Sequence, residues 1–464
     1  MPYLVTLITL TFFATWPTIN LSAMEGAPSE ASFGEQRVIQ QTLQESPCEI
    51  DILPDEIVMH IFSFLNLKDI FSPTLTCHKW KQLMQDNNLW REYARRAQLL
   101  ILPGLAGDKN YKELVRANCI PAFAILGSLN KGNDAGVFAT NFDGSVIVGT
   151  ACDKDKSKNT KAFRWTAQEG ITFLGESSNQ ACATNFDGTV IIGSNIVNEA
   201  SRLVKSSFRW AANEGMVTLR TAKGTLPSYT FAKGTNFDGS VIVGEAEGTA
   251  FRWTAQEGIL FLGTLNGGNY SNAQATNYDG SIIVGEAVEN RQKRAFRWTE
   301  QDGMVSLGTL NGGNFSYAHT TNYDGSIVIG CASDGKQQNE LRAIRWTAKE
   351  GMVSLGTLNG MPKSQAIATN VDGSVIVGEA GKGPNLNQSQ AFRWTPGKGM
   401  ESIQELLSDQ DLLPPNCKLI WAGAITPLGT TVVGDAIFDD SDPNAETFIW
   451  RAVLPRDNLF NRGY

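Results

Sequence analysis

A pentapeptide containing tryptophan recurs from residue 162 onward, and it constrains the fold more than any other feature of the chain. Its first copy reads A-F-R-W-T at residues 162–166, and six later segments repeat it with small changes. The tryptophans of these copies lie 43 to 56 residues apart: Trp165, Trp210, Trp253, Trp298, Trp346, Trp394 and Trp450. Self-similarity at a near-constant period of this length is typical of propellers and solenoids.

Each repeat carries further signals that predict strands. The motif T-N-[FY]-D-G-[ST] begins at Thr140 and recurs in the later repeats, and Asp-Gly between β-branched and aromatic residues favours a tight hairpin turn. An apolar run follows it, as at residues 145–149. The pentapeptide, a second turn of the type A-Q-E-G and a last apolar segment complete the unit. Four short antiparallel strands of this kind make one propeller blade.

The two ends of the repeat region predict how the ring closes. The seventh repeat has no fourth strand after residues 447–451, but a matching segment, residues 123–130, precedes the first repeat. We expect this segment to complete the last blade, so that no blade edge is left open. The predicted fold class is mainly β, a seven-bladed propeller of four-stranded blades preceded by a small α-helical domain.

The upstream helical region is predicted from residues 53–91. Pro54 suits the first turn of a helix, and an apolar stripe at helical spacing follows at Ile57, Ile61 and Leu65. One interpretation is that these side chains form the internal core of a small helical bundle and contact no partner. About forty residues rarely bury so many aliphatic side chains alone, however, so a partner that offers a groove for a helix is also expected.

This region resembles the F-box in the order and spacing of its residues. The resemblance is carried by Leu53-Pro54, Glu56-Ile57, Ile61-Phe62, Phe64-Leu65, Asp69, Cys77, Trp80 and Leu89-Trp90-Arg91. It implies a surface that docks on the Skp-type adaptor of a cullin–RING ubiquitin ligase. The residues that would face the adaptor are Leu53, Pro54, Ile57, Ile61 and Leu65.

The propeller repeats resemble the HAF repeat family of bacterial proteins over roughly residues 139–451. The resemblance rests on A-F-R-W and T-N-x-D-G-S-x-x-V-G, although Ala or Ser stands where that family usually has His in the first motif. It implies a fold more than an activity. Neither the Gly-His and Trp-Asp pairs of WD repeats nor the double glycine of kelch repeats is present.

The domain boundaries follow from these segments. We expect an apolar signal-like segment over residues 1–23, a linker over 24–47, the F-box over 48–95, a helical linker over 96–120, the propeller over 121–455 and a tail over 456–464. The first segment is too short for a stable membrane span, and no Lys or Arg occurs before Arg37. It is an export signal, a mis-assigned start upstream of Met24, or a buried N-terminal element.

Composition argues against several classes of function. The net charge is −8 and no basic stripe is present, which disfavours nucleic acid as a partner. The seven cysteines are scattered, which fits a reducing compartment, and the three histidines lack the spacing of metal ligands. No cofactor or metal is expected. No nucleophile elbow, P-loop or dinucleotide fingerprint occurs, so we predict a non-catalytic protein.

The repeated Asp and Arg are predicted to be structural. Asp143 and its counterparts lie in the Asp-Gly turn, and Arg164 and its counterparts lie beside the tryptophans. The seventh repeat lacks both, because residues 427–429 replace the turn and Ile449 replaces the Arg. Since an unpaired buried charge is costly, this joint loss predicts that Asp143 and Arg164 pair within a blade or across neighbouring blades.

The blade topology separates an invariant face from a variable one. The Asp-Gly and A-Q-E-G turns share one face, whereas the loops of the opposite face differ from blade to blade. Binding residues lie disproportionately on loops, and aromatic side chains are common interface anchors. We therefore predict target binding at Tyr229, Tyr270, Phe315 and Tyr317 on the variable face. Alternatively, these side chains pack against their own loops.

Together, these features predict the substrate-recognition subunit of an SCF-type ubiquitin ligase. The F-box would dock on the Skp-type adaptor and cullin complex, and the propeller would bind an unknown target protein. A eukaryote-type module joined to bacterial-type repeats indicates a bacterial effector acting in the cytoplasm of a host cell, an inference that rests on resemblance. The alternative is an exported HAF-repeat propeller that binds glycan or surface ligands without a ligase role; a propeller hydrolase is a third.

Overall fold

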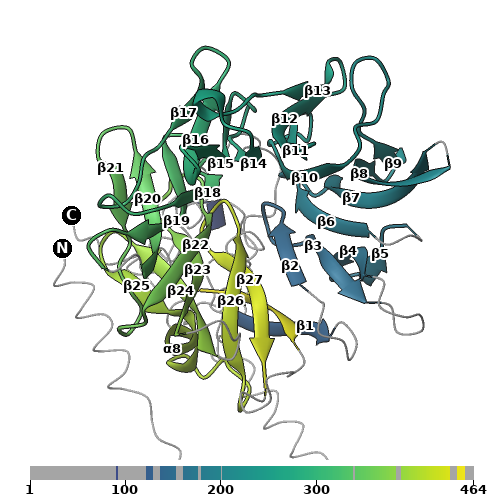
Figure 1. Cartoon of the computed structure of the whole chain (residues 1–464). Coiled ribbons are helices and arrows are strands. Elements are labelled where there is room, and N and C mark those ends of the chain that lie inside the picture. Colours follow the sequence, from purple (N-terminus) through teal and green to yellow (C-terminus); the bar gives the residue numbers. More distant parts are fainter. Residues whose placement is uncertain are drawn as a thin grey trace, which may run out of the picture. The chain divides into compact units, whose positions relative to one another are not determined.

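The described part of the chain forms a β-propeller. The computed structural model describes residues 90–91, 122–128, 136–152, 160–175, 179–199, 201–337, 340–382, 388–438 and 447–454. Their strands form seven four-stranded antiparallel sheets arranged around a central axis (Figure 1). The predicted fold class, a seven-bladed propeller of four-stranded blades, is thereby confirmed.

Six blades each consist of four consecutive strands, numbered from the axis outward. The first blade consists of β2 (Gly136–Thr140), β3 (Ile147–Cys152), β4 (Thr160–Thr166) and β5 (Gly170–Phe173). The second blade consists of β6 (Asn179–Thr184), β7 (Val190–Glu199), β8 (Arg202–Ala211) and β9 (Gly215–Thr218). The third blade consists of β10 (Thr230–Thr235), β11 (Ile242–Ala246), β12 (Thr249–Thr254) and β13 (Gly258–Phe261). The next three are β14 (Ser271–Thr276), β15 (Ile282–Glu289), β16 (Gln292–Thr299) and β17 (Gly303–Ser306); β18 (Ser316–Thr321), β19 (Ile327–Asp334), β20 (Glu340–Thr347) and β21 (Gly351–Ser354); and β22 (Lys363–Thr369), β23 (Ile376–Gly381), β24 (Ser389–Thr395) and β25 (Gly399–Ser402). Two short helical elements are η3 (Leu265–Gly267) and α8 (Ile403–Ser408).

The seventh blade joins the two ends of the propeller. Its strands are β26 (Lys418–Ile425), β27 (Thr431–Ile437), β28 (Phe448–Val453) and, on the outside, β1 (Ala122–Ser128). The strands β1 and β28 are antiparallel, with Ala122 opposite Val453 and Ser128 opposite Phe448. In Figure 1 the dark-blue β1 accordingly lies beside the yellow strands of the C-terminal end. The sequence prediction that residues 123–130 complete the last blade is confirmed.

The recurring turn between the first two strands of a blade is held by its own side chains. In the first blade, Asn141 Oδ1 accepts a hydrogen bond from the Val146 N–H at 2.9 Å. Asp143 Oδ1 accepts from the Ser145 N–H at 3.0 Å, and Gly144 takes a φ of 70°. Only glycine adopts that conformation without strain, which explains the Asp-Gly pair. The same two side-chain bonds recur in the next five blades.

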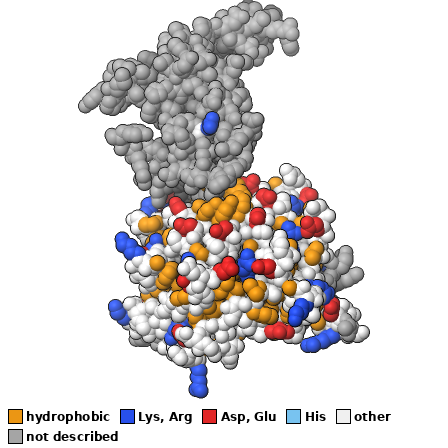
Figure 2. Space-filling view, turned by 90° about the horizontal axis from the view of Figure 1, so that it is seen from above, with side chains coloured by type: hydrophobic (Ala, Val, Ile, Leu, Met, Phe, Trp, Pro, Cys, Tyr) orange, Lys and Arg blue, Asp and Glu red, His pale blue; other side chains and the backbone are white. Residues whose placement is uncertain are grey.

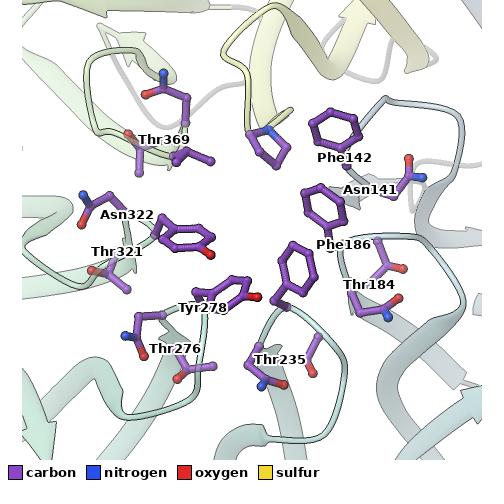
Figure 3. Close-up of a pocket in the computed structure, with 18 of the residues that line it drawn as sticks. Asn141, Phe142, Thr184, Phe186, Thr235, Thr276, Tyr278, Thr321, Asn322 and Thr369 are labelled. Atoms are coloured by element: carbon purple, nitrogen blue, oxygen red, sulfur yellow. The ribbon is translucent and has the colours of Figure 1, made fainter. Parts of the chain in front are cut away.

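These turns are joined to one another around the axis. The backbone N–H of the residue before each Asp donates to the carbonyl of the equivalent residue in the next blade, at 2.8 to 3.1 Å, for Phe142, Phe186, Phe237, Tyr278, Tyr323 and Val371. The first five side chains are aromatic, and their rings stack in sequence with centroids 4.1 to 4.6 Å apart. Figure 3 shows rings of this series directed toward the middle of the channel. The seventh position is Pro427, which has no N–H, so the series of donors ends there.

A second contact, made by a serine at the start of the inner strand, joins neighbouring blades at three junctions. Ser271 Oγ, at the start of β14, accepts from the Ala250 N–H at 2.8 Å and donates to the Gly263 carbonyl at 2.6 Å. Ser316 and Ser364 make the same pair of bonds in later blades. Because these groups are buried, leaving them unpaired would cost about 1–3 kcal/mol each. The two hydrogen bonds of each serine therefore set the spacing between the blades that they join.

The repeated tryptophan is not the most buried residue of its strand. The Phe two positions earlier is fully buried at Phe163, Phe208, Phe251, Phe296 and Phe392. The tryptophans of the first six blades are half-buried and pack against the core between blades, and only Trp450 is fully buried. Phe123 of β1 stacks on Trp450 with ring centroids 6.3 Å apart, so the closing strand contributes to this core.

The predicted pairing of Asp143 with Arg164 is wrong. Arg164 forms an ion pair of 2.7 Å with Glu169, the Glu of the A-Q-E-G turn on the same hairpin, while the Asp143 carboxylate caps its own turn. Equivalent pairs are Arg209–Glu214, Arg252–Glu257 and Arg345–Glu350. In the sixth blade, where that turn has no Glu, Glu401 of the neighbouring strand pairs with Arg393 at 2.7 Å.

The arginine pairs are surface features in most blades. The Arg side chains of the four equivalent pairs are 21 to 24% exposed and their Glu partners 49 to 57%. Each such pair contributes at most about 1 kcal/mol. These ion pairs therefore stabilise the hairpin between the third and fourth strands of a blade and do not hold neighbouring blades together.

Loss of β1 is expected to open the ring. A truncation that removes residues 1–130 exposes the edge of β28 and the surface of Trp450, so it should lower the melting temperature by about 10 °C or more. A truncation that removes residues 1–100 retains β1 and should melt like the full chain. Thermal unfolding followed by circular dichroism checks both, and equal melting of the two truncations would contradict the closure.

Candidate functional site

The propeller has two chemically different faces. The face that we call the turn face carries the Asp-Gly turns, such as residues 141–145, and the second turns, such as residues 167–169. The opposite face, the loop face, is where the inner strands begin and the hairpins between second and third strands end. These hairpins vary in length: β7 and β8 have ten residues each, whereas β11 has five and β12 six.

The axial cavity of the turn face offers little room for a ligand. Its cavity at the axis has a volume of about 200 Å³ and is lined by the Thr, Asn and ring residues of the Asp-Gly turns (Figure 3). Small-molecule sites usually occupy about 300–1,000 Å³. A groove of about 890 Å³ runs between the first two blades. The charged side chains Arg164 and Arg209 on its wall are already paired with Glu169 and Glu214.

On the loop face, a single carboxylate links two of the predicted aromatic residues. Tyr229 immediately precedes β10, and its hydroxyl donates to Glu245 Oε1 at 2.8 Å. Tyr270 immediately precedes β14 in the next blade, and its hydroxyl donates to Glu245 Oε2 at 3.5 Å. Glu245 therefore connects blades three and four at this face.

A lysine connects the other two aromatic residues to this pair. Lys293 Nζ lies 5.5 Å from the ring centroid of Tyr270 and 5.3 Å from that of Tyr317, and it forms an ion pair of 3.4 Å with Glu286. The rings of Phe315 and Tyr317 are 5.3 Å apart. The structure thus brings together all four predicted residues. Tyr317 lies inside strand β18, however, rather than in the loop before it.

The tyrosine hydroxyls remain protonated donors in this arrangement. The hydrogen bond to Glu245 raises the pKa of Tyr229, and burial, followed by the charge of Glu245, raises the pKa of Tyr270 to about 12. Tyr229 is still 39% exposed, and the other three residues are half-buried. The cluster therefore presents aromatic surface that is held in place and partly open to a partner.

Sequence reasoning did not find the charged residues of this cluster, although a signal was available. The residue after the Gly of the second strand varies more than the motif around it, although four of its seven copies are acidic: Thr150, Ser194, Glu245, Glu286, Cys331, Glu379 and Asp435. The register places this position opposite the inner strand, with Glu245 facing Phe231 and Glu286 facing Asn272. Because the rest of the strand is nearly constant, variation at this one position predicts that the surface it lines differs in chemistry from blade to blade.

The other predicted residues lie outside the described part of the chain. These are the adaptor-facing residues Leu53, Pro54, Ile57, Ile61 and Leu65, together with residues 1–23. Among the described residues, no helix is long and apolar enough to cross a membrane. Nor do three or more His, Cys, Asp or Glu side chains gather there as metal ligands would.

Comparison with known proteins identifies an F-box-like domain. Residues 50–96 match the F-box-like family model. The chain is 41% identical over 54 residues to F-box/WD repeat-containing protein 7 of Drosophila melanogaster, covering 12% of this chain and 4% of that protein. It is 44% identical over 39 residues to F-box/LRR-repeat protein 12 of Homo sapiens, covering 8% of this chain and 12% of that protein. The chain thus spans only a small part of these relatives.

Solved structures give a weaker likeness. The β-propeller domain of the Trilobed protease from Pyrococcus furiosus has a TM-score of 0.46 at 12% identity, over 71% of this chain and 99% of that chain. TolB from Acinetobacter baumannii has a TM-score of 0.37 at 12% identity, over 67% of this chain and 80% of that chain.

The described surface carries charges of both signs. In the view of Figure 2, hydrophobic side chains gather in several groups, and acidic and basic side chains are intermixed among them.

Asp435 at the variable position of the seventh blade gives a pH-dependent contribution to stability. A part of it remains accessible to water, but protein atoms surround its carboxyl group. This burial raises its pKa to about 7, against a smaller opposing effect of the hydrogen bond from the Val137 N–H. The folded-state pKa is then above the unfolded value of about 3.9, so the contribution of Asp435 to stability is fully present below about pH 4 and is lost as the pH rises to about 7.

Replacing Asp435 by Asn should remove this dependence. Asn keeps an oxygen for the Val137 N–H but cannot ionise, so the free energy of unfolding should vary less between pH 5 and pH 8. The difference from the wild type should reach the order of 1 kcal/mol per pH unit. Urea unfolding at several pH values measures it, with Asp409→Asn at an exposed carboxylate as control. Parallel pH profiles of Asp435→Asn and wild type would contradict the assignment.

Proposed function

We propose that this protein is the substrate-recognition subunit of an SCF-type cullin–RING ubiquitin ligase. The observation that carries the proposal is the F-box-like domain at residues 50–96, joined in one chain to a seven-bladed propeller. In this arrangement the F-box docks on a Skp-type adaptor, and the propeller holds a target protein. The adaptor would contact Leu53, Pro54, Ile57, Ile61 and Leu65, as the resemblance to the F-box implies.

The propeller is proposed to bind its target without catalysing a reaction. The one Cys–His contact that the described residues offer joins Cys331 Sγ and His319 Nε2 at 4.0 Å. Burial raises the pKa of Cys331 to about 12, whereas a nucleophilic cysteine needs a lowered pKa. Burial also lowers the pKa of His319, which donates through Nδ1 to the Ala366 carbonyl at 2.8 Å. This pair suits packing between blades rather than acyl transfer.

The cellular setting of this function is also a proposal. The HAF-type repeats resemble bacterial proteins and the F-box serves eukaryotic ligases, which supports an effector that a bacterium delivers into the host cytoplasm. Residues 1–23 would then serve export. The rival proposal is an exported propeller that binds glycan or surface ligands. Adaptor binding separates the two.

Capture of the adaptor tests the ligase role. The full chain, expressed with a tag in human cells, should co-purify with the endogenous Skp-type adaptor and its cullin. The double variant Leu53→Ala/Pro54→Ala should lose both, because it removes apolar side chains from the proposed interface. Val305→Ala, at a propeller residue that is 49% exposed, is the control and should retain them. Absence of the adaptor from the wild-type eluate would reject the proposal.

Target capture is expected to depend on the aromatic cluster. Tyr270→Ala/Phe315→Ala removes two aromatic anchors, so target recovery in quantitative proteomics should fall at least about tenfold, while adaptor binding persists. Tyr270→Phe, which removes only the hydroxyl bond to Glu245, should have a smaller effect.

The matched control for this pair is Val305→Ala/Val353→Ala. These residues are 49% and 36% exposed on the outer strands β17 and β21, away from the loop face. The control should capture the target as the wild type does, and both double variants should melt within a few degrees of it. Equal target recovery by Tyr270→Ala/Phe315→Ala and wild type would move the site elsewhere.

A further inference from the structure

The hairpin between β7 and β8 extends beyond its counterpart in the next blade and exposes aliphatic side chains. Its register sets Ile196 opposite Lys205 and Asn198 opposite Leu203 on one side. Leu203 is 73% exposed and Ile196 44%. Exposed aliphatic side chains next to one another on a rigid hairpin are a common feature of interaction surfaces.

The other side of the hairpin is tied to the propeller. Val204 on that side is 7% exposed, and Glu199 forms a two-pronged ion pair with Arg220, with both N···O distances at 3.0 Å. A backbone bridge also joins Lys205 to Tyr229 of the next blade. Because these contacts fix the hairpin, the aliphatic side chains are displayed at a defined place beside blade three.

Two lysines converge on one aromatic ring next to this hairpin. Lys205 Nζ, from β8, lies 4.0 Å from the ring centroid of Phe231, and Lys233 Nζ, from β10, lies 5.7 Å from it. Their charges also act on the same buried thiol: burial raises the pKa of Cys182 to about 12, and both lysines oppose that rise. The two ammonium groups therefore share one small region, although they belong to adjacent blades.

No carboxylate in the described part of the chain forms an ion pair with either lysine. Of the neighbouring acidic residues, Glu286 pairs with Lys293, whereas Glu245, opposite Phe231 in the register, accepts hydrogen bonds from two tyrosine hydroxyls and keeps its charge. The neutral side-chain amide of Asn272 lies beside Lys233, and with its oxygen turned toward the lysine it accepts from Lys233 Nζ at 3.2 Å. Two ammonium groups at one place, neither of them in an ion pair among the described residues, favour the binding of an anion.

We propose that this region of the loop face is an acidic-peptide subsite. Lys205 and Lys233 over Phe231 take a carboxylate side chain of the partner, and Ile196 and Leu203 take an adjacent aliphatic side chain. The partner class is therefore a protein segment in which Asp or Glu stands beside Leu, Ile or Val. That this partner is the ligase target depends on the proposed function. The subsite itself depends only on the two lysines and the exposed hairpin.

Peptide selection on the full-length protein tests the subsite directly. A random 12-residue display library is selected against the wild type and against Lys205→Met/Lys233→Met, which removes both charges but keeps apolar stems over Phe231. Lys223→Met/Lys363→Met, at two exposed lysines elsewhere on the propeller, is the matched control. We expect acidic residues next to aliphatic ones to be enriched on the wild type and the control, and not on the Lys205/Lys233 variant.

The strongest selected peptide is then synthesised and its affinity measured by fluorescence anisotropy. Lys205→Met/Lys233→Met and the Glu→Gln version of the peptide should each weaken binding at least about tenfold, and added salt should weaken the wild-type complex. Ile196→Ser/Leu203→Ser should weaken binding without changing its salt dependence. Selection of peptides without acidic enrichment, or equal affinity for the wild type and the lysine variant, would overturn the proposal.

Failure of the subsite and failure of the ligase role give different results. Adaptor capture is measured on the same preparations. Acidic peptides that bind a chain unable to capture the adaptor would leave the subsite standing and reject the ligase role. Adaptor capture by a chain that shows no acidic preference would reject the subsite alone.

Discussion

The hydrogen bonds between Asp-Gly turns around the axis are the constraint on which the propeller depends. The turns of the first six blades each donate one backbone N–H to the next blade, and the aromatic rings of the first five pack against one another in sequence. The turn can do this only because Asn141 and Asp143, like their counterparts, hold it in one conformation. A local sequence preference thereby becomes a contact between residues that are 41 to 56 positions apart in the chain, and the repeat must be kept nearly constant to preserve it.

The seventh blade shows what happens where this constraint lapses. Pro427 accepts from the Val371 N–H but cannot donate onward, so the axial series is open at one point. Closure there relies on other contacts: the pairing of β1 with β28, the Phe123–Trp450 stack, and Arg451, which donates to the Gly144 carbonyl at 3.3 Å. The ring is thus held at its joint by packing and by strand pairing instead of by its repeated turn.

Much of the fold could be predicted from the sequence because it follows from local, repeated signals. The Asp-Gly turns, the pentapeptide and the displaced strand at residues 123–130 gave the blade, the number of blades and the closure. The Asp143–Arg164 pairing failed because the joint loss of both residues in one blade does not distinguish contact from shared membership of a motif. The links through Glu245 and Lys293 were missed because they depend on side chains that meet only across blades.

The difference between the constant turns and the variable positions explains how a repeated scaffold can carry a specific binding surface. The position after the second-strand Gly lies opposite the inner strand and takes no part in the Asp-Gly turn, so its side chain can change without disturbing the axial series. Ser194, Glu245, Glu286 and Cys331 occupy that position in four consecutive blades, so its chemistry changes from a hydroxyl to a carboxylate to a thiol. The length of the β7–β8 hairpin can change for the same reason, since its end lies on the loop face. Specificity in this protein therefore resides where the repeat is free to vary, and the turns that cannot vary hold those positions in register.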